Sequence, residues 1–224
     1  MQTTIGARLA SAVPFVTQGA RVADIGTDHA YLPIYLVEKG IASAAIACDV
    51  NRGPLDSAVA NIREAGLSDQ IETLLADGLH GVENFAPTDV LIFGMGGELI
   101  VRILSEAPWI RRGDVNLILQ PMSRAATLRR WLVENGFAIT DEAISLEDRY
   151  YQTVVARYCG EKTAYTACEC QVGRRNIESR PPLFEGLLRH EIAVLETILR
   201  GKARSLDADA TEELRLKTSL EELL

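Results

Sequence analysis

The sequence predicts an α/β protein: a mostly parallel seven-stranded sheet that ends in an antiparallel hairpin, followed by a small C-terminal α-helical domain. Residues 1–160 alternate short apolar runs with segments of helical period, which is typical of a parallel sheet covered by helices on both faces. The last two apolar runs of this part follow each other without a helix between them. After Gly160 the composition changes, and leucine and isoleucine recur at intervals of three and four residues, as in amphipathic helices.

The expected elements follow from these patterns in chain order. Strands are expected at the apolar runs 21–25, 44–50, 71–75, 90–93, 116–120, 137–145 and 151–158, and helices at 31–39, 54–65, 97–107 and 124–135. A further helix carries the stripe from Leu183 to Leu199, and another begins at Asp209, which with Glu212 resembles a capping box. We expect these two helices to form an antiparallel pair. The sequence thus divides into domains 1–160 and 161–224.

Length and composition limit the functional classes. The 224 residues suit one α/β domain with a smaller appendage. No stretch approaches the roughly 18 apolar residues of a membrane span, and the N-terminal segment lacks the pattern of an export signal, so we expect a cytoplasmic protein with no membrane partner. The four cysteines and three histidines show no metal-binding spacing, since Cys168 and Cys170 are separated by one residue and have no nearby histidine. We expect no metal site.

The charge distribution leaves a nucleic-acid partner possible. The net charge of -8 argues against one, because binding to phosphates needs positive potential. Locally, however, residues 102–130 hold six arginines against two acids, and residues 162–204 hold eight basic residues against five acidic ones. The acidity is therefore concentrated elsewhere in the chain.

The strongest motif is the turn after the first expected strand, with the sequence VADIGTDHA at 22–30. Gly26 allows the backbone to turn sharply and to approach a ligand. Dinucleotide-binding proteins carry further glycines where Asp28 and Ala30 stand here. The anionic Asp28 would repel a diphosphate but attract a cationic cofactor such as S-adenosylmethionine. We take Asp24, Gly26 and Asp28 as cofactor-binding, and His29 either as part of the site or as a helix cap.

Acidic residues also follow the next two strands. Asp49 stands 25 residues after Asp24, where an acid can accept hydrogen bonds from the ribose hydroxyls of an adenosine cofactor. Asp77-Gly78 follows the third strand, and Asp77 is placed to accept from the adenine amino group, although an ordinary turn would explain this pair equally well. The ends of successive parallel strands meet at one crevice. Three acids there favour an adenosine-containing cofactor.

A cluster of glycines follows the fourth strand. Three glycines occur in the four residues Gly94-Met95-Gly96-Gly97, and such a cluster is unfavourable in the unfolded chain unless a positive φ or a flat ligand requires it. A purine ring is such a ligand. We expect this loop to face the reacting group, and Gln120, at the end of the fifth strand, to border the same crevice.

These residues together resemble the bacterial tRNA (adenine-22-N1)-methyltransferase family, often called TrmK. The resemblance rests on Arg8-Leu9, VADIGTDHAYLP at 22–33, Asp49-Val50-Asn51, Asp77-Gly78-Leu79, Gly94-Met95-Gly96-Gly97 and Leu119-Gln120-Pro121. It implies a Rossmann-like class I methyltransferase domain with a coiled-coil-like C-terminal domain, and methyl transfer from S-adenosylmethionine to N1 of a tRNA adenine at position 22. The expected catalytic residues are Asp28, His29, Gly94, Met95 and Gly96, and the expected cofactor-binding residues are Asp24, Gly26, Asp28, His29, Asp49, Val50, Asp77, Gly78, Gly94 and Gln120.

The tRNA is expected to contact arginines in the two basic segments. These are Arg124, Arg129 and Arg130 beside the catalytic crevice, and Arg174 and Arg175 in the C-terminal domain. A solvated helix face explains Arg129 and Arg130 equally well. Two other functions stay open, a methyltransferase for another RNA or a small molecule and a non-catalytic RNA-binding protein. A dehydrogenase would need the third glycine that the first turn lacks. A monomer is the expected state, with oligomers left open.

Overall fold

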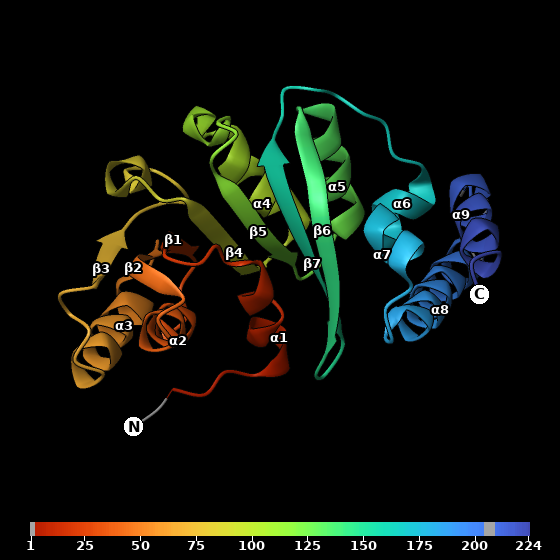
Figure 1. Ribbon diagram of the computed structural model, residues 1–224. Helices are drawn as coiled ribbons and strands as arrows, with labels where there is room; N and C mark the ends of the chain where they lie inside the picture. Colours follow the sequence, from red (N-terminus) through yellow and green to blue (C-terminus); the bar gives the residue numbers. More distant parts are fainter. Residues whose placement is uncertain (1–2, 204–208) are drawn as a thin grey trace.

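The computed structural model describes residues 3–203 and 209–224, and its centre is a seven-stranded sheet (Figure 1). The strands lie in the order β3-β2-β1-β4-β5-β7-β6. Neighbours among the first five strands pair in parallel, whereas β7 is antiparallel to both β5 and β6. The bounds are β1 (Ala20–Ile25), β2 (Ala42–Asp49), β3 (Ile71–Leu75), β4 (Asp89–Met95), β5 (Asn116–Pro121), β6 (Phe137–Leu146) and β7 (Tyr150–Tyr158). The predicted parallel sheet with a terminal antiparallel hairpin is confirmed.

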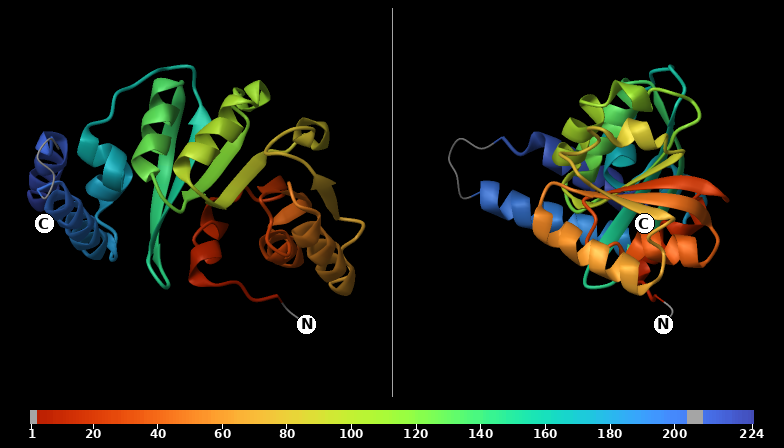
Figure 2. Two further views of the ribbon diagram at one scale, coloured as in Figure 1. Left: turned by 180° about the vertical axis from the view of Figure 1, so that it is seen from behind. Right: turned by 90° about the vertical axis from the view of Figure 1, so that its left-hand side faces the viewer.

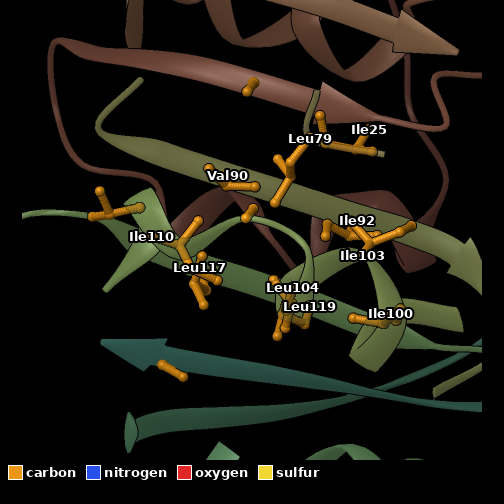
Figure 3. Close-up of a cluster of buried hydrophobic side chains, with 14 of the residues drawn as sticks. Ile25, Leu79, Val90, Ile92, Ile100, Ile103, Leu104, Ile110, Leu117 and Leu119 are labelled. Carbon is orange, nitrogen blue, oxygen red and sulfur yellow. The ribbon is translucent and has the colours of Figure 1, made fainter. Parts of the chain in front are cut away.

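Helices cover both faces of this sheet. α2 (Tyr31–Glu38) and α3 (Arg52–Glu64) pack on one face, and α4 (Gly97–Ser105) and α5 (Ala125–Glu134) on the other (Figures 1 and 2). Successive strand residues point to opposite faces, so Val22 belongs to the core beneath α2 and α3, and Ala23 to the core beneath α4 and α5. Figure 3 shows the second core, where α4 contributes Ile100, Ile103 and Leu104.

Short helices were not predicted, because three to six residues are too few to show a period. They are α1 (Ala7–Ala10), α6 (Ala167–Val172), α7 (Arg174–Ser179) and the 3-10 turns η1 (Val13–Phe15), η2 (Val82–Phe85) and η3 (Pro108–Ile110). The capping box predicted at Asp209 is wrong. Ala210 occupies the N-cap position of α9, and Asp209 instead accepts a hydrogen bond from the Thr211 N–H. A true capping box opens α6, between Thr166 and Glu169.

The C-terminal helices have a hydrophobic core of their own. α8 (Phe184–Lys202) and α9 (Thr211–Glu221) pack on each other beyond the β6 end of the sheet (Figure 1). Their core also takes in Ile144 and Tyr150 from the β6–β7 hairpin. We propose on this basis that residues 161–224 form a second domain that is fastened to the hairpin. Within the two described ranges, no helix has both the length and the apolar character needed to cross a bilayer.

A buried ion pair joins the two parts of the chain. The Arg129 Nε lies 2.6 Å from the Glu142 Oε1, and both side chains are fully buried. Arg129 also donates to the Gln152 Oε1 and to the carbonyls of Cys170 and Gln171, near the end of α6. The prediction that Arg129 contacts tRNA is therefore wrong, because every donor group that would meet a phosphate is enclosed by protein.

Glu142 extends this ion pair, called here the buried joint, to the start of α7. Its Oε2 accepts a hydrogen bond of 2.9 Å from the Arg175 N–H at the start of α7. Thus a cation meets the carbonyl end of α6 and an anion meets the amide end of α7, the arrangement that helix dipoles favour. The residue between the two helices, Gly173, has φ +90°, and a Cβ there would collide with the Glu142 carboxylate. Only glycine lets this corner approach the ion pair.

We expect Arg129→Ala to destabilise the protein by about 3 to 5 kcal/mol, because it leaves the buried Glu142 carboxylate unpaired. The neighbouring Arg130→Ala is the control, since that side chain is exposed and should change the free energy of unfolding by no more than about 0.5 kcal/mol. Urea denaturation measures both. The double variant Arg129→Ala/Glu142→Ala should lose less than the sum of the two single losses. An additive loss would contradict the pairing.

Candidate active site

The candidate site is a cavity of about 490 Å³ at the carboxyl ends of β1, β2 and β4. A smaller cavity of about 90 Å³ adjoins it, and the two share Gly26, Asp49, Val50 and Met95. Ligands of open α/β sheets bind at this edge, because the carboxyl ends of neighbouring parallel strands open into one crevice. Most of the expected cofactor residues line one of the two cavities, namely Asp24, Gly26, Asp28, Asp49, Val50, Asp77, Gly78 and Gly94.

Asp24 is the buried acid of the larger cavity. It lies in β1 with only 7% of its surface exposed. The pKa of its carboxyl is raised to about 6, mainly by burial and in smaller part by the carboxylates of Asp28 and Asp49, while the Arg8 guanidinium opposes the shift. A carboxyl with this pKa is poised between its charged and neutral forms near neutral pH. It gains from a bound cation that favours the charged form.

The turn after β1 is held against β2. The Gly26 and Thr27 N–H groups both donate to the Cys48 carbonyl at 2.8 Å. Gly26 has φ +74°, and a Cβ there would collide with the terminal methyl of Met95. The glycine is therefore favoured above all by its positive φ, since the flexible Met95 side chain could move aside.

His29 lies beside the cavity without lining it. Its Nε2 is 3.1 Å from the Asp28 Oδ1. The N-cap position of α2 belongs to Ala30, which receives no side-chain hydrogen bond, so the alternative that His29 caps this helix finds no support. Both His29 and Ala30 have positive φ, at 60° and 57°, a strained conformation for residues other than glycine. Asp28, which precedes them, lines the cavity with a side chain that is 81% exposed.

Asp49 and Val50 stand where a nucleoside would be expected. Asp49 lines both cavities, and its Oδ1 accepts a hydrogen bond of 2.7 Å from the Asn51 N–H. Val50 is 61% exposed over the same space, an apolar surface against which a flat ring can pack. The pair therefore offers a polar acceptor beside an apolar contact.

Asp77 is already engaged by a neighbouring cation. The Arg102 NH2 lies 3.0 Å from the Asp77 Oδ1, and the Arg102 NH1 lies 3.4 Å from the Oδ2. This contact lowers the pKa of the Asp77 carboxyl. Asp77 and Gly78 still line the smaller cavity, but Asp77 could accept from an adenine amino group only by sharing an oxygen with Arg102.

The three glycines at the end of β4 and the start of α4 have different surroundings. Gly94 has φ +76° and lines the larger cavity, with open space where a Cβ would stand. Gly96 faces the Ser123 hydroxyl, and a Cβ on Gly97 would collide with the Arg124 carbonyl. Of the two explanations that the sequence offered, Gly94 has the positive φ and also lines the cavity that a flat ligand would enter, whereas Gly97 is explained by packing. Met95 lines both cavities, whereas Gly96 lines neither.

Gln120 is wrongly predicted as a cofactor ligand. Its fully buried amide donates to the Arg8 carbonyl at 3.1 Å and to the hydroxyls of Ser11 and Thr153. It therefore fastens α1 to the sheet, and its side chain lines neither cavity. The reason is that α1 covers the end of β5, which the pattern of strands alone could not indicate.

Several residues of the cavity were missed as site residues. Arg8, Tyr31, Asn51 and Phe93 all line it. Arg8 comes from α1 and its NH1 lies 3.5 Å from the Gln120 Oε1. Tyr31 opens α2, is 44% exposed and has its ring centroid 5.4 Å from that of His29. Both residues lie inside the motifs that carried the family resemblance, which was the available signal.

The remaining arginines expected to bind tRNA are all at the surface. Arg124 is 71% exposed, with its Nε 3.9 Å from the Glu98 Oε1. Arg174 is 35% exposed, pairs with Glu169 at 2.7 Å and stacks on the Tyr165 ring. Arg175 pairs with Glu178 at 3.0 Å, whereas Arg130 is exposed and makes no ion pair with the residues in the described ranges. Arg124 and Arg130 are thus the arginines of this set least engaged by protein.

A parallel sheet that ends in an antiparallel hairpin, with acids at the ends of β1 and β2, defines a Rossmann-like methyltransferase domain, and residues 5–155 match the protein family described as a methyltransferase domain. The tRNA (adenine(22)-N(1))-methyltransferase of Bacillus subtilis is 37% identical over 167 residues, 74% of this chain and 70% of that protein. This chain belongs to the family of tRNA (adenine(22)-N(1))-methyltransferases.

Solved structures agree over almost the whole chain. The crystal structure of the B. subtilis m1A22 tRNA methyltransferase TrmK superimposes with a TM-score of 0.86 at 30% identity, covering 99% of each chain. A Streptococcus pneumoniae protein in complex with S-adenosyl-L-methionine gives a TM-score of 0.87 at 35% identity, covering 99% of this chain and 100% of that one. The likeness therefore includes the C-terminal helices, which lie beyond the motifs that carried the sequence resemblance.

The Asp24 carboxyl should make stability depend on pH. Its pKa of about 6 in the folded protein lies above the roughly 3.9 of an unfolded chain, so the folded state binds the proton more tightly. The stability from this group is full below about pH 4 and is lost as the pH rises through about 6. Asp24→Asn should therefore gain about 2 to 3 kcal/mol of unfolding free energy at about pH 8 and little at about pH 4. Denaturant titrations at both values measure this, and a loss at pH 8 would contradict it.

Proposed function

We propose that this protein transfers a methyl group from S-adenosylmethionine to N1 of adenine 22 in tRNA. The observation that carries the proposal is the cavity at the ends of β1, β2 and β4, with its acids Asp24, Asp28 and Asp49. Its volume of about 490 Å³ suits a nucleoside-sized ligand. The relatives bear the names of tRNA m1A22 methyltransferases. We also propose that the protein acts as a monomer, in the cytoplasm, on its tRNA.

The chemistry of the cavity fits S-adenosylmethionine. Its amino-acid part carries an ammonium and a carboxylate, and the cavity holds one buried acid, Asp24, together with the guanidinium of Arg8. We assign Asp24 to the ammonium side and Arg8 to the carboxylate. Asp49 is placed to accept from the ribose hydroxyls, and the exposed Val50 to cover the adenine ring. Acids around the site also favour the positive sulfonium.

Catalysis can rest on alignment and electrostatics. When bound, S-adenosylmethionine supplies an electrophilic methyl group, whose bond to sulfur breaks as its bond to adenine N1 forms. Neutral adenine N1 carries a lone pair in the ring plane, so no residue has to remove a proton first. The adenine becomes positively charged, and the exposed carboxylate of Asp28 can stabilise that charge. Gly94 and Met95 line the space beside the methyl position in this assignment.

The target base must leave its stack to react. N1 lies on the Watson-Crick edge, so a paired or stacked adenine cannot present it to the cavity. Tyr31 offers a half-exposed aromatic ring at the cavity wall, and base-aromatic stacking is a common way to hold an extruded base. Arg124 and Arg130, with Arg174 and Arg175 as weaker candidates, are proposed to contact the tRNA around it.

The proposal is tested by methyl transfer to unmodified tRNA. We expect labelled methyl groups to pass from S-adenosylmethionine to a tRNA with adenine at position 22, and no transfer to the same tRNA with guanine there. Primer extension should stop at position 22, since methylation of N1 blocks pairing. Methylation of both tRNAs would point to another RNA site, and binding without transfer would point to a non-catalytic RNA-binding protein.

Asp49→Ala should weaken S-adenosylmethionine binding by about 1.5 to 3 kcal/mol, the value of a hydrogen bond to a charged group. Calorimetric titration measures the affinity. Asp69→Ala is a matched control, because Asp69 is an exposed acid in the turn before β3, at the opposite end of that strand from the cavity. If Asp49→Ala folded normally and bound the cofactor as tightly as the control, the assignment of Asp49 to the cofactor site would be wrong.

A further inference from the structure

We propose that the groove between α5 and α9 binds the sugar-phosphate backbone of tRNA, and that Arg130 and Arg215 contact phosphates from its opposite walls. The inference rests on the proposed function, because it takes tRNA as the substrate. It replaces the expected arrangement of two separate arginine surfaces by one groove between the two parts of the chain. It also adds Arg215, a residue that the sequence did not single out.

The groove has a volume of about 530 Å³ and two charged walls. One wall consists of α5 and the residue that precedes it, and the other is formed by α6 and α9, which lie side by side in Figure 1. Hydroxyl groups stand on both walls and can donate to phosphate oxygens. The polar residues that face each other here are Arg124, Thr127 and Arg130 on one wall and Glu212, Arg215 and Ser219 on the other.

The arginines of this groove are available to a ligand. Arg130 and Arg215 are exposed and make no ion pair within residues 3–203 and 209–224. By contrast, Arg175 and Arg189 on the C-terminal helices pair with acids at 3.0 and 2.7 Å. An unpaired guanidinium binds a phosphate without first giving up a carboxylate. In a chain of net charge -8, such a groove is a local attraction for a polyanion.

The groove contains two acids, and only one of them is neutralised by an ion pair. Glu213 is already paired with Lys202. Glu212 is exposed on the α9 wall and makes no ion pair with the described residues. Its carboxylate would repel a phosphate. Neutralising Glu212 should therefore strengthen tRNA binding, whereas loss of Arg215 should weaken it.

One wall of the groove is joined through the chain to the segment that follows β5 and that is hydrogen-bonded to the end of β4 and the start of α4. The Gly97 N–H donates to the Ser123 carbonyl, and the Met122 N–H donates to the Met95 carbonyl, both at 2.8 Å. Arg124, which lines the groove, directly follows Ser123 in the chain. A tRNA backbone held by Arg124 would therefore lie near Met95, which lines the cavity into which the target base must turn.

The two walls are held at a fixed separation. Arg129 lies on α5 next to Arg130 and donates from the buried side to the Cys170 and Gln171 carbonyls of α6, and Gln171 itself lines the groove. α6 in turn packs on α9. A groove whose walls are set in advance loses little entropy when a ligand binds. The buried joint thus acts as a positioning element for the arginines on the surface.

The test measures tRNA binding by the full-length protein at salt concentrations from about 50 to 200 mM. Arg130→Ala and Arg215→Ala should each weaken binding several-fold and each reduce the salt dependence by about one counterion, and the double variant by about two. Glu212→Gln should tighten binding. Arg111→Ala is the matched control, since Arg111 is equally exposed but lies before β5, at the opposite end of that strand from the cavity. S-adenosylmethionine affinity should be unchanged in all of them.

The outcomes separate this inference from the proposed function. Unchanged salt dependence in both arginine variants, or an equal loss in Arg111→Ala, would overturn the groove, as would a wild-type protein that does not bind tRNA. A wild-type protein that binds tRNA but does not methylate it would refute the proposed activity, while the salt dependence of the variants would still decide about the groove.

Discussion

The parallel pairing of β1 with β2 and β4 is the constraint on which the site depends. This pairing sets Ile25 beside Cys48 and Ile92, so the residues that follow all emerge at one edge of the sheet. The turn after β1 is fixed there by two hydrogen bonds to the Cys48 carbonyl. Acids that are far apart in the chain become neighbours around one cavity, and their mutual repulsion and burial make the site receptive to a cation.

The second part of the chain is attached through charge and not only through apolar contact. Arg129 and Glu142 are both fully buried, and removing either would leave the other without its counter-charge. They hold the corner between α6 and α7 by the two helix ends that match their signs. The same helix, α5, therefore faces the core with Arg129 and the solvent with Arg130. Adjacent arginines acquire structural and surface roles because successive residues of a helix point in different directions.

Function and stability oppose each other at the cavity. The buried Asp24 carboxyl is destabilising when charged, the left-handed His29 and Ala30 store backbone strain, and Val50 exposes an apolar side chain. Such features concentrate where a ligand can compensate for them. A cation beside Asp24 and a flat ring over Val50 would each relieve one of these costs, which agrees with an adenosine cofactor that carries positive charge.

The sequence by itself determined the strands and the helices of residues 1–160 within two residues, and the two long C-terminal helices within three. It also determined the acids Asp24 and Asp49, because period and strand ends are local properties of the chain. The tertiary structure alone decided the roles of Arg129, Gln120 and Gly97, since each depends on partners from distant segments. It also brought Arg215 opposite Arg130 across a groove. Whether a polar side chain faces a ligand, the solvent or the core is set by what packs against it, and that information is not local.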